Sequence, residues 1–185
     1  TKKNSDSGDY LDYLFREIRH KKSLLNGNAI VKQVHLGGGT PTFLDDDELT
    51  VLWQFLQDEF DFAHDGDYSV EIDPRELRQT TLATLHTLGV NRLSFGVQDL
   101  NERVQIAVNR VQPHSLVQAV MSEARRLGFG SINIDLIYGL PHQSVASMAD
   151  TVAKIIALAP DRLSGFNYAH LPARFSAQRR LKDNG

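Results

Sequence analysis

Five short β-branched segments alternate with stretches of helical periodicity, and this alternation constrains the fold more than any other feature of the chain. A parallel sheet is the usual outcome when strands alternate with helices, because each crossover helix returns the chain to the end of the sheet at which the previous strand began. The sequence therefore predicts an α/β fold with about five parallel strands, at residues 29–36, 68–73, 92–98, 131–139 and 162–169.

Helices are predicted in the intervening segments, where apolar residues recur at helical spacing. The clearest start signal is Asp45, which can cap a helix together with Glu48 three positions later. Leu49, Leu52 and Trp53 follow on one face of that helix. Further helices are predicted at residues 9–25, about 76–88, between 101 and 127, and at 145–158.

An open doubly wound sheet and part of a (β/α) barrel both fit this alternation. Polar residues favour the barrel, because they follow every predicted strand and a barrel gathers such groups at one mouth. They lie at 37–42, 71 and 73, 98–99, 135 and 138, and 167–170. We therefore expect a single domain over residues 1–185, folded as a partial (β/α) TIM-like barrel with outer helices.

Composition restricts the classes of partner. The net charge of −3 comes from interspersed acids and bases, so no basic field favours nucleic acid or an anionic membrane. No apolar run reaches the ~20 residues of a membrane-spanning helix. A soluble, cytoplasmic protein is expected. The chain has no cysteine, and its polar ends lead us to expect a piece of a longer protein.

The loop HLGGGTPTFL, residues 35–44, is a candidate ligand site. Gly38, Gly39 and Thr40 can bring backbone amides close to a small polar group, and Pro41 stiffens the turn. A phosphate nest and a plain turn are equally open interpretations. The loop lacks the Lys-Ser/Thr of a P-loop and the spacing of a dinucleotide fingerprint.

Four further polar residues are candidates for binding. Arg110 offers a guanidinium suited to a carboxylate, near the strand that ends at Gln98. Asp135 and Glu71 are acids inside apolar strands, where each needs a structural partner or a ligand. A surface ion pair is the alternative interpretation of Arg110, and a structural network that of either acid.

The spacing of the histidines does not indicate a metal site. None of the seven lies in an HxH or HExxH pattern, so no metal site is predicted. His35 is interpreted as a packed strand residue.

Five ordered motifs are similar to those of one known family. They are HLGGGTPTFL, EIDPREL, RLSFGVQDLNERVQIAVNRVQP, NIDLIYGLP and FNYAHLP. Together they resemble the oxygen-independent coproporphyrinogen III oxidases, radical S-adenosylmethionine (SAM) enzymes of anaerobic haem biosynthesis. The resemblance implies a 4Fe–4S cluster that reduces SAM to a 5′-deoxyadenosyl radical. It also implies decarboxylation of coproporphyrinogen III to protoporphyrinogen IX, an electron donor and a monomeric parent.

The resemblance also implies roles for individual residues. Gly38, Gly39 and Thr40 would hold the methionine end of SAM, and Arg110 would pair with its carboxylate. Asp135 and Gln98 would lie near the ribose, and the backbone of Ala169 would contact the adenine. Glu71 matches a further SAM-contacting acid.

One departure from the family is large, because its CxxxCxxC loop and first barrel strand are missing here. This chain alone is therefore expected to be inactive. A haem chaperone of the same superfamily shares the GGGTP and NIDLIYGLP-like motifs and is the nearest alternative. A phosphate-binding α/β domain and a structural domain without a small ligand also stay open.

Overall fold

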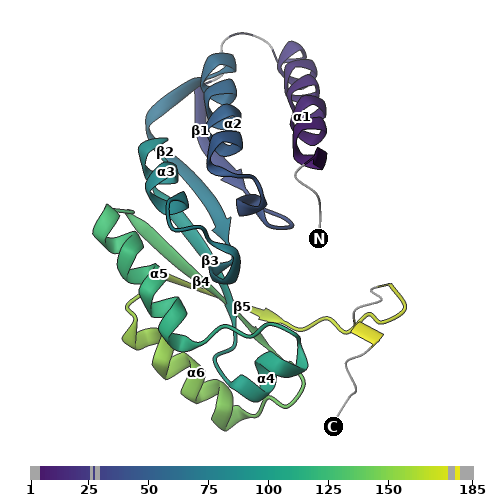
Figure 1. The fold of residues 1–185 in the computed structure, drawn as a ribbon, viewed down its shortest axis with the longest axis vertical. Coiled ribbons are helices and arrows are strands. Elements are labelled where there is room, and N and C mark those ends of the chain that lie inside the picture. Colours follow the sequence, from purple (N-terminus) through teal and green to yellow (C-terminus); the bar gives the residue numbers. More distant parts are fainter. Residues whose placement is uncertain (1–4, 26, 28–29, 175–177, 180–185) are drawn as a thin grey trace.

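A curved parallel sheet of five strands forms the centre of the computed structural model, which describes residues 5–25, 27, 30–174 and 178–179. The strands lie in sequential order: β1 (Ile30–Leu36), β2 (Asp61–Ile72), β3 (Arg92–Gln98), β4 (Ser131–Tyr138) and β5 (Arg162–Asn167). Each pairs in parallel with the next. The curled sheet is open between β1 and β5, which makes it part of a barrel, as predicted (Figure 1).

The helices follow the outer side of the sheet. They are α1 (Ser5–Ser23), α2 (Asp46–Glu59), α3 (Thr81–Thr87), α4 (Glu102–Ala107), α5 (His114–Leu127) and α6 (Val145–Ala157), with 3-10 turns at Pro41–Phe43 and Pro74–Glu76. The predicted cap of α2 is present: Asp45 accepts a hydrogen bond from the Glu48 amide, and Glu48 accepts one from the Asp45 amide. Among the described residues, no helix is long and apolar enough to cross a membrane.

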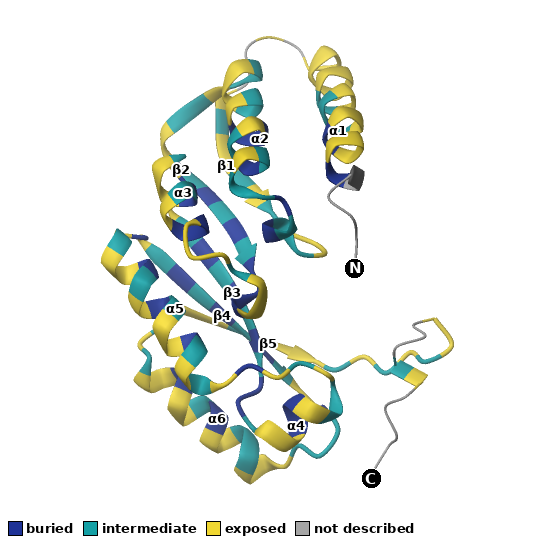
Figure 2. Cartoon of the chain, viewed as in Figure 1, coloured by how far each residue is buried: buried dark blue, intermediate teal, exposed yellow. Residues whose placement is uncertain are grey.

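The hydrophobic core lies between the sheet and the helices. Val70, Phe95 and Ile134, on three neighbouring strands, are fully buried against Leu85 of α3 and Ile155 of α6. Along β3, β4 and residues 66–72 of β2, buried residues alternate with half-buried ones (Figure 2). The two faces of the sheet therefore differ: one packs the core, and the other carries polar side chains.

The element boundaries differ most from the prediction at the starts of β2 and α3. Strand β2 begins at Asp61, because residues 61–62 pair with β1 across an irregular register between Val31 and Gln33. Helix α3 begins at Thr81 instead of about residue 76. The reason is Pro74, which starts a separate 3-10 turn capped by Asp73.

Candidate functional site

A small pocket of about 150 Å³ lies where the carboxyl ends of β2 and β3 meet the glycine-rich loop after β1. Barrel enzymes place their binding groups at this end of the sheet. Five of the eight residues predicted to bind a ligand line the pocket. Its lining comprises Gly39, Thr40, Pro41, Glu71, Ile72, Asp73, Gly96, Gln98 and Arg110.

The glycine-rich loop is tied to β2 through Glu71. The Gly38 amide donates a 3.1 Å hydrogen bond to Oε2 of Glu71, and Nε2 of His35 lies 3.2 Å from Oε1. Gly38 and Gly39 both have positive φ, 72° and 68°, which glycine adopts without strain. His35 is exposed and bonded to Ser69 as well, so its interpretation as a packed residue was wrong.

Gln98 ends β3 in a left-handed conformation, with φ of 68°. A non-glycine residue in this region costs of order 1 kcal/mol or more, and such residues concentrate at functional sites. The pairing with β4 is irregular between Gly96 and Gln98. The bend brings Gln98 into the lining of the pocket.

Arg110 lies after α4, and its side chain reaches back to β3 and to the turn after β2. Its Nη1 lies 3.1 Å from Oδ2 of Asp73, and its Nη2 donates a 2.6 Å hydrogen bond to the Gly96 carbonyl. The Nε is buried and has no hydrogen-bond partner among the described residues. Burial lowers the pKa of the Arg110 guanidinium, and the Asp73 carboxylate opposes that shift.

Asp135 belongs to a hydrogen-bonded network on the inner face of the sheet. Its carboxylate accepts hydrogen bonds from the Ser94 hydroxyl at 2.9 Å and the Asn133 amide at 2.7 Å. Ser164 of β5 donates to Asn133 at 3.1 Å. Asp135 pairs in register with Gly96, a residue of the pocket, and so lies on the strand beside it.

Ala169 follows β5 and is exposed. Its carbonyl accepts a 3.1 Å hydrogen bond from Gln178. Within the described residues, no interaction links Ala169 to the pocket lining. The structure thus brings together Gly38, Gly39, Thr40, Glu71, Gln98 and Arg110, with Asp135 on the adjoining strand and Ala169 after the last one.

Four residues of the pocket lining were absent from the predicted set, namely Pro41, Ile72, Asp73 and Gly96. Asp73 was recognised only as a polar residue at a strand end. Gly96 could have been found from the two-residue period of β3, because it shares a face with Ser94 and Gln98.

The residues present do not fit an iron–sulfur cluster. The chain has no cysteine, and its described part contains no group of three or more acidic or histidine side chains able to hold a metal ion. Cluster ligation requires thiolates.

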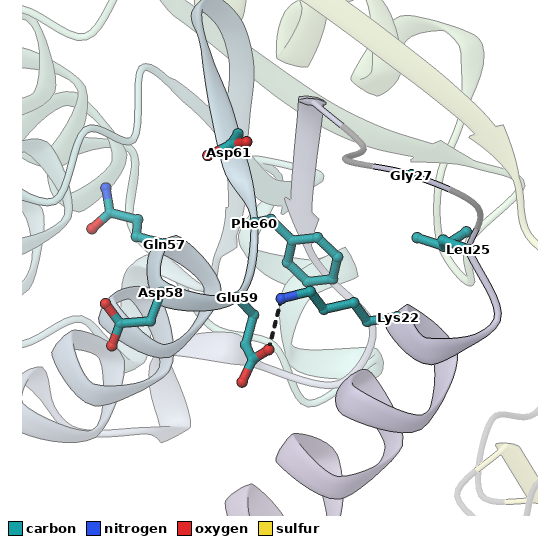
Figure 3. Close-up of a pocket in the computed structure, with 8 residues that line it drawn as sticks. All are labelled: Lys22, Leu25, Gly27, Gln57, Asp58, Glu59, Phe60 and Asp61. Carbon is teal, nitrogen blue, oxygen red and sulfur yellow. Dashed lines mark hydrogen bonds and ion pairs between the residues drawn. The ribbon is translucent and has the colours of Figure 1, made fainter.

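A larger pocket of about 250 Å³ lies near the start of β2, at the opposite end of the strand from the glycine-rich loop. In Figure 3 the Lys22 ammonium points to the Glu59 carboxylate, 3.0 Å away. Functional groups of barrels lie at the carboxyl ends of strands, so the smaller pocket is the candidate site. The larger one is lined by Lys22, Leu25, Gly27, Gln57, Asp58, Glu59, Phe60 and Asp61.

Comparison with known families decides the relationship. The model of the radical SAM superfamily matches residues 4–155. The chain belongs to this superfamily. Its radical SAM relatives include the oxygen-independent coproporphyrinogen III oxidases of Escherichia coli (strain K12), 48% identical over 183 residues, and of Pseudomonas aeruginosa, 49% identical over 183 residues. These alignments cover 99% and 98% of this chain, and 40% of each relative.

A solved radical SAM structure supports the same relationship. The coproporphyrinogen III oxidase from Escherichia coli superposes with a TM-score of 0.94 at 48% identity, over 99% of this chain and 42% of that one. The predicted fold class and the resemblance drawn from the five motifs are therefore confirmed. The chain spans about two fifths of the length of the curated relatives it matches.

Proposed function

We propose that this chain is the SAM-binding part of an oxygen-independent coproporphyrinogen III oxidase. The full-length enzyme would convert coproporphyrinogen III to protoporphyrinogen IX by oxidative decarboxylation of two propionates, using electrons from a separate donor. The observation that carries the proposal is the 48% identity over 183 residues to an enzyme of that name. A monomeric state and a cytoplasmic location belong to the same proposal.

The charges of the pocket suit the methionine end of SAM. An α-amino acid presents one ammonium and one carboxylate, and the pocket offers the Glu71 carboxylate and the Arg110 guanidinium. Both oxygens of Glu71 retain acceptor capacity beside their contacts with Gly38 and His35. The backbone of Gly39 and Thr40 would close the pocket around this end of the cofactor.

The remaining residues would orient the nucleoside. Asp135 accepts two hydrogen bonds, and a carboxylate can accept about four, so it has capacity for ribose hydroxyls. Gln98 would lie beside the ribose, and Ala169 would contact the adenine through its backbone. When bound and reduced, SAM supplies the radical chemistry; the residues of this chain only bind and orient it.

The cluster would be held outside this chain, because thiolate ligands are absent from it. A direct test therefore uses the full-length protein, reconstituted with iron and sulfide under anaerobic conditions. We expect SAM binding by calorimetry, reductive SAM cleavage, and formation of protoporphyrinogen IX from coproporphyrinogen III. Haem binding without decarboxylation would instead indicate a haem chaperone. Tight binding of inorganic phosphate in place of SAM would indicate a phosphate-binding domain.

A further inference from the structure

Asp73 is the most buried acid of the pocket, with only 9% of its surface exposed. It follows β2 directly and caps the 3-10 turn at Pro74–Glu76, accepting a hydrogen bond from the Arg75 amide at 3.0 Å. Its oxygens also accept from the Arg75 side chain, at 3.0 Å from Nε and 2.7 Å from Nη2. The contacts with Arg75 therefore fix the Asp73 carboxylate in position independently of Arg110.

Arg110 uses this fixed carboxylate as one of two anchors. Nη1 faces Asp73 at 3.1 Å, and Nη2 donates to the Gly96 carbonyl at 2.6 Å. One anchor directly follows β2 and the other lies in β3, so together they set the plane of the guanidinium. An arginine side chain without such anchors has many rotamers, and ligand binding would have to overcome the loss of that freedom.

The backbone of Arg110 is held equally firmly. Its amide donates a 2.8 Å hydrogen bond to the Gln105 carbonyl, and the preceding Asn109 has a positive φ of 54°. The buried Gln105 side chain bonds both the carbonyl and the amide of Gln112, at 2.9 and 3.1 Å. Hydrogen bonds between Gln105, at one end of the loop that carries Arg110, and Gln112, at the other end, thus hold the loop in one conformation.

Donor capacity remains for a ligand. A guanidinium has five N–H groups, and the two anchors use one from each Nη. The Nε–H is unpartnered within the described structure. A carboxylate in the pocket would meet the second N–H of one or both Nη atoms, and an orientation fixed in advance would lower the entropic cost of that contact.

We propose that Asp73 is a positioning residue, which holds the Arg110 guanidinium in the orientation that receives the SAM carboxylate. The inference rests on the proposed function, because it takes SAM as the ligand of this pocket. Asp73 makes no contact with the cofactor in this scheme; it acts through Arg110. Stability alone is a weak explanation of this ion pair, since a buried ion pair is often no more stabilising than apolar residues in its place.

The test compares SAM with decarboxylated SAM, which lacks the group that Arg110 would receive. Binding of each to the full-length, cluster-reconstituted protein is measured by calorimetry, for wild type and for Asp73→Asn. We expect the substitution to weaken SAM binding about tenfold, as is common for residues that orient a binding group. Binding of decarboxylated SAM should change less than about twofold, a discrimination that a general structural defect would not produce.

Two further variants make the outcome decisive. Glu17→Gln removes a negative charge from an exposed position of α1 that does not line the pocket, and should leave both affinities unchanged. If Asp73→Asn does not fold, Asp73→Glu keeps the charge and displaces the carboxylate, and should show the same preferential loss for SAM. Equal or tighter SAM binding by the Asp73 variants overturns the positioning role. A wild type that binds neither ligand overturns the proposed function itself.

Discussion

The Nη2 of Arg110 donates a 2.6 Å hydrogen bond to the carbonyl oxygen of Gly96, which lies near the carboxyl end of β3 and lines the pocket. The close approach depends on the missing side chain of the glycine. A Cβ on Gly96 would lie 3.1 Å from Nη2 of Arg110 and 3.0 Å from Nε2 of Gln98. Gly96 therefore leaves room for two of the residues proposed to bind SAM.

Gly96→Ala should reduce SAM affinity with little effect on the fold. The new methyl group meets only the ends of two flexible side chains, which can move aside, but both would leave their present positions. We expect SAM binding to weaken about tenfold in the cluster-reconstituted protein, measured by calorimetry.

The matched control for this substitution is Gly165→Ala, in β5. A Cβ at Gly165 meets nothing within 4 Å, so its SAM affinity should equal that of the wild type. Wild-type affinity in Gly96→Ala would contradict the proposed arrangement of Arg110 and Gln98.

Arg110→Ala should weaken SAM binding by about 1.5–3 kcal/mol, or roughly ten- to a hundredfold, because the SAM carboxylate loses a charged donor. Asp73 keeps its contacts with Arg75, so the turn after β2 should persist. The cluster absorbance should also persist, since this chain supplies no thiolate ligands. Arg103→Ala, an exposed arginine of α4, is the control and should bind SAM normally.

Gln105→Met should lower the free energy of unfolding by about 3 kcal/mol or more. Methionine fills the buried space but leaves the Asp99 and Gln112 carbonyls and the Gln112 amide without their partner, and such groups cost about 1–3 kcal/mol each. Chemical denaturation measures the loss. Gln118→Met, on the exposed side of α5, should change stability by less than about 0.5 kcal/mol.

Asp73 should contribute stability that disappears in acid. Burial alone would raise the pKa of Asp73, but hydrogen bonds from Arg75 and the charge of Arg110 outweigh it, and the pKa falls below its ordinary value of 3.8. A group with a depressed folded pKa stabilises the protein above its unfolded pKa and loses that effect as the pH falls through the folded pKa.

The stability difference between wild type and Asp73→Asn tests this directly. It should be constant between about pH 7 and 5 and shrink below about pH 4. Denaturant titrations at a series of pH values measure it. A difference that grows on acidification would show that the sign is wrong.

The strands were predictable because periodicity and β-branched composition mark them independently of tertiary contacts. Their sequential order is that of a (β/α) barrel, the architecture predicted, in which each right-handed crossover places the next strand beside the last. The cap of α2 was equally local, since Asp45 and Glu48 satisfy each other's backbone amides within four residues. The resemblance of the five motifs indicated the family, and it implied roles for candidate residues whose roles the local sequence pattern left open.

Other features depend on contacts between distant segments and could not be predicted. The early start of β2 comes from pairing with β1, because Asp61 and its neighbours carry no alternating pattern. Asp73 gave no signal as a partner of Arg110, which lies 37 positions later; only the fold brings them within 3.1 Å. The contacts of His35 with Ser69 and Glu71 likewise required the register of β1 against β2.

The two unlike faces of the sheet have a consequence for how such proteins diversify. Apolar packing that stabilises the fold lies on the helix side, whereas Ser94, Asn133 and Asp135 lie on the other. Substitutions on the polar face remove little buried apolar surface, so they lower the small free energy of unfolding by little. A lineage built on this sheet can therefore exchange the groups that face its ligand, one at a time, and still fold.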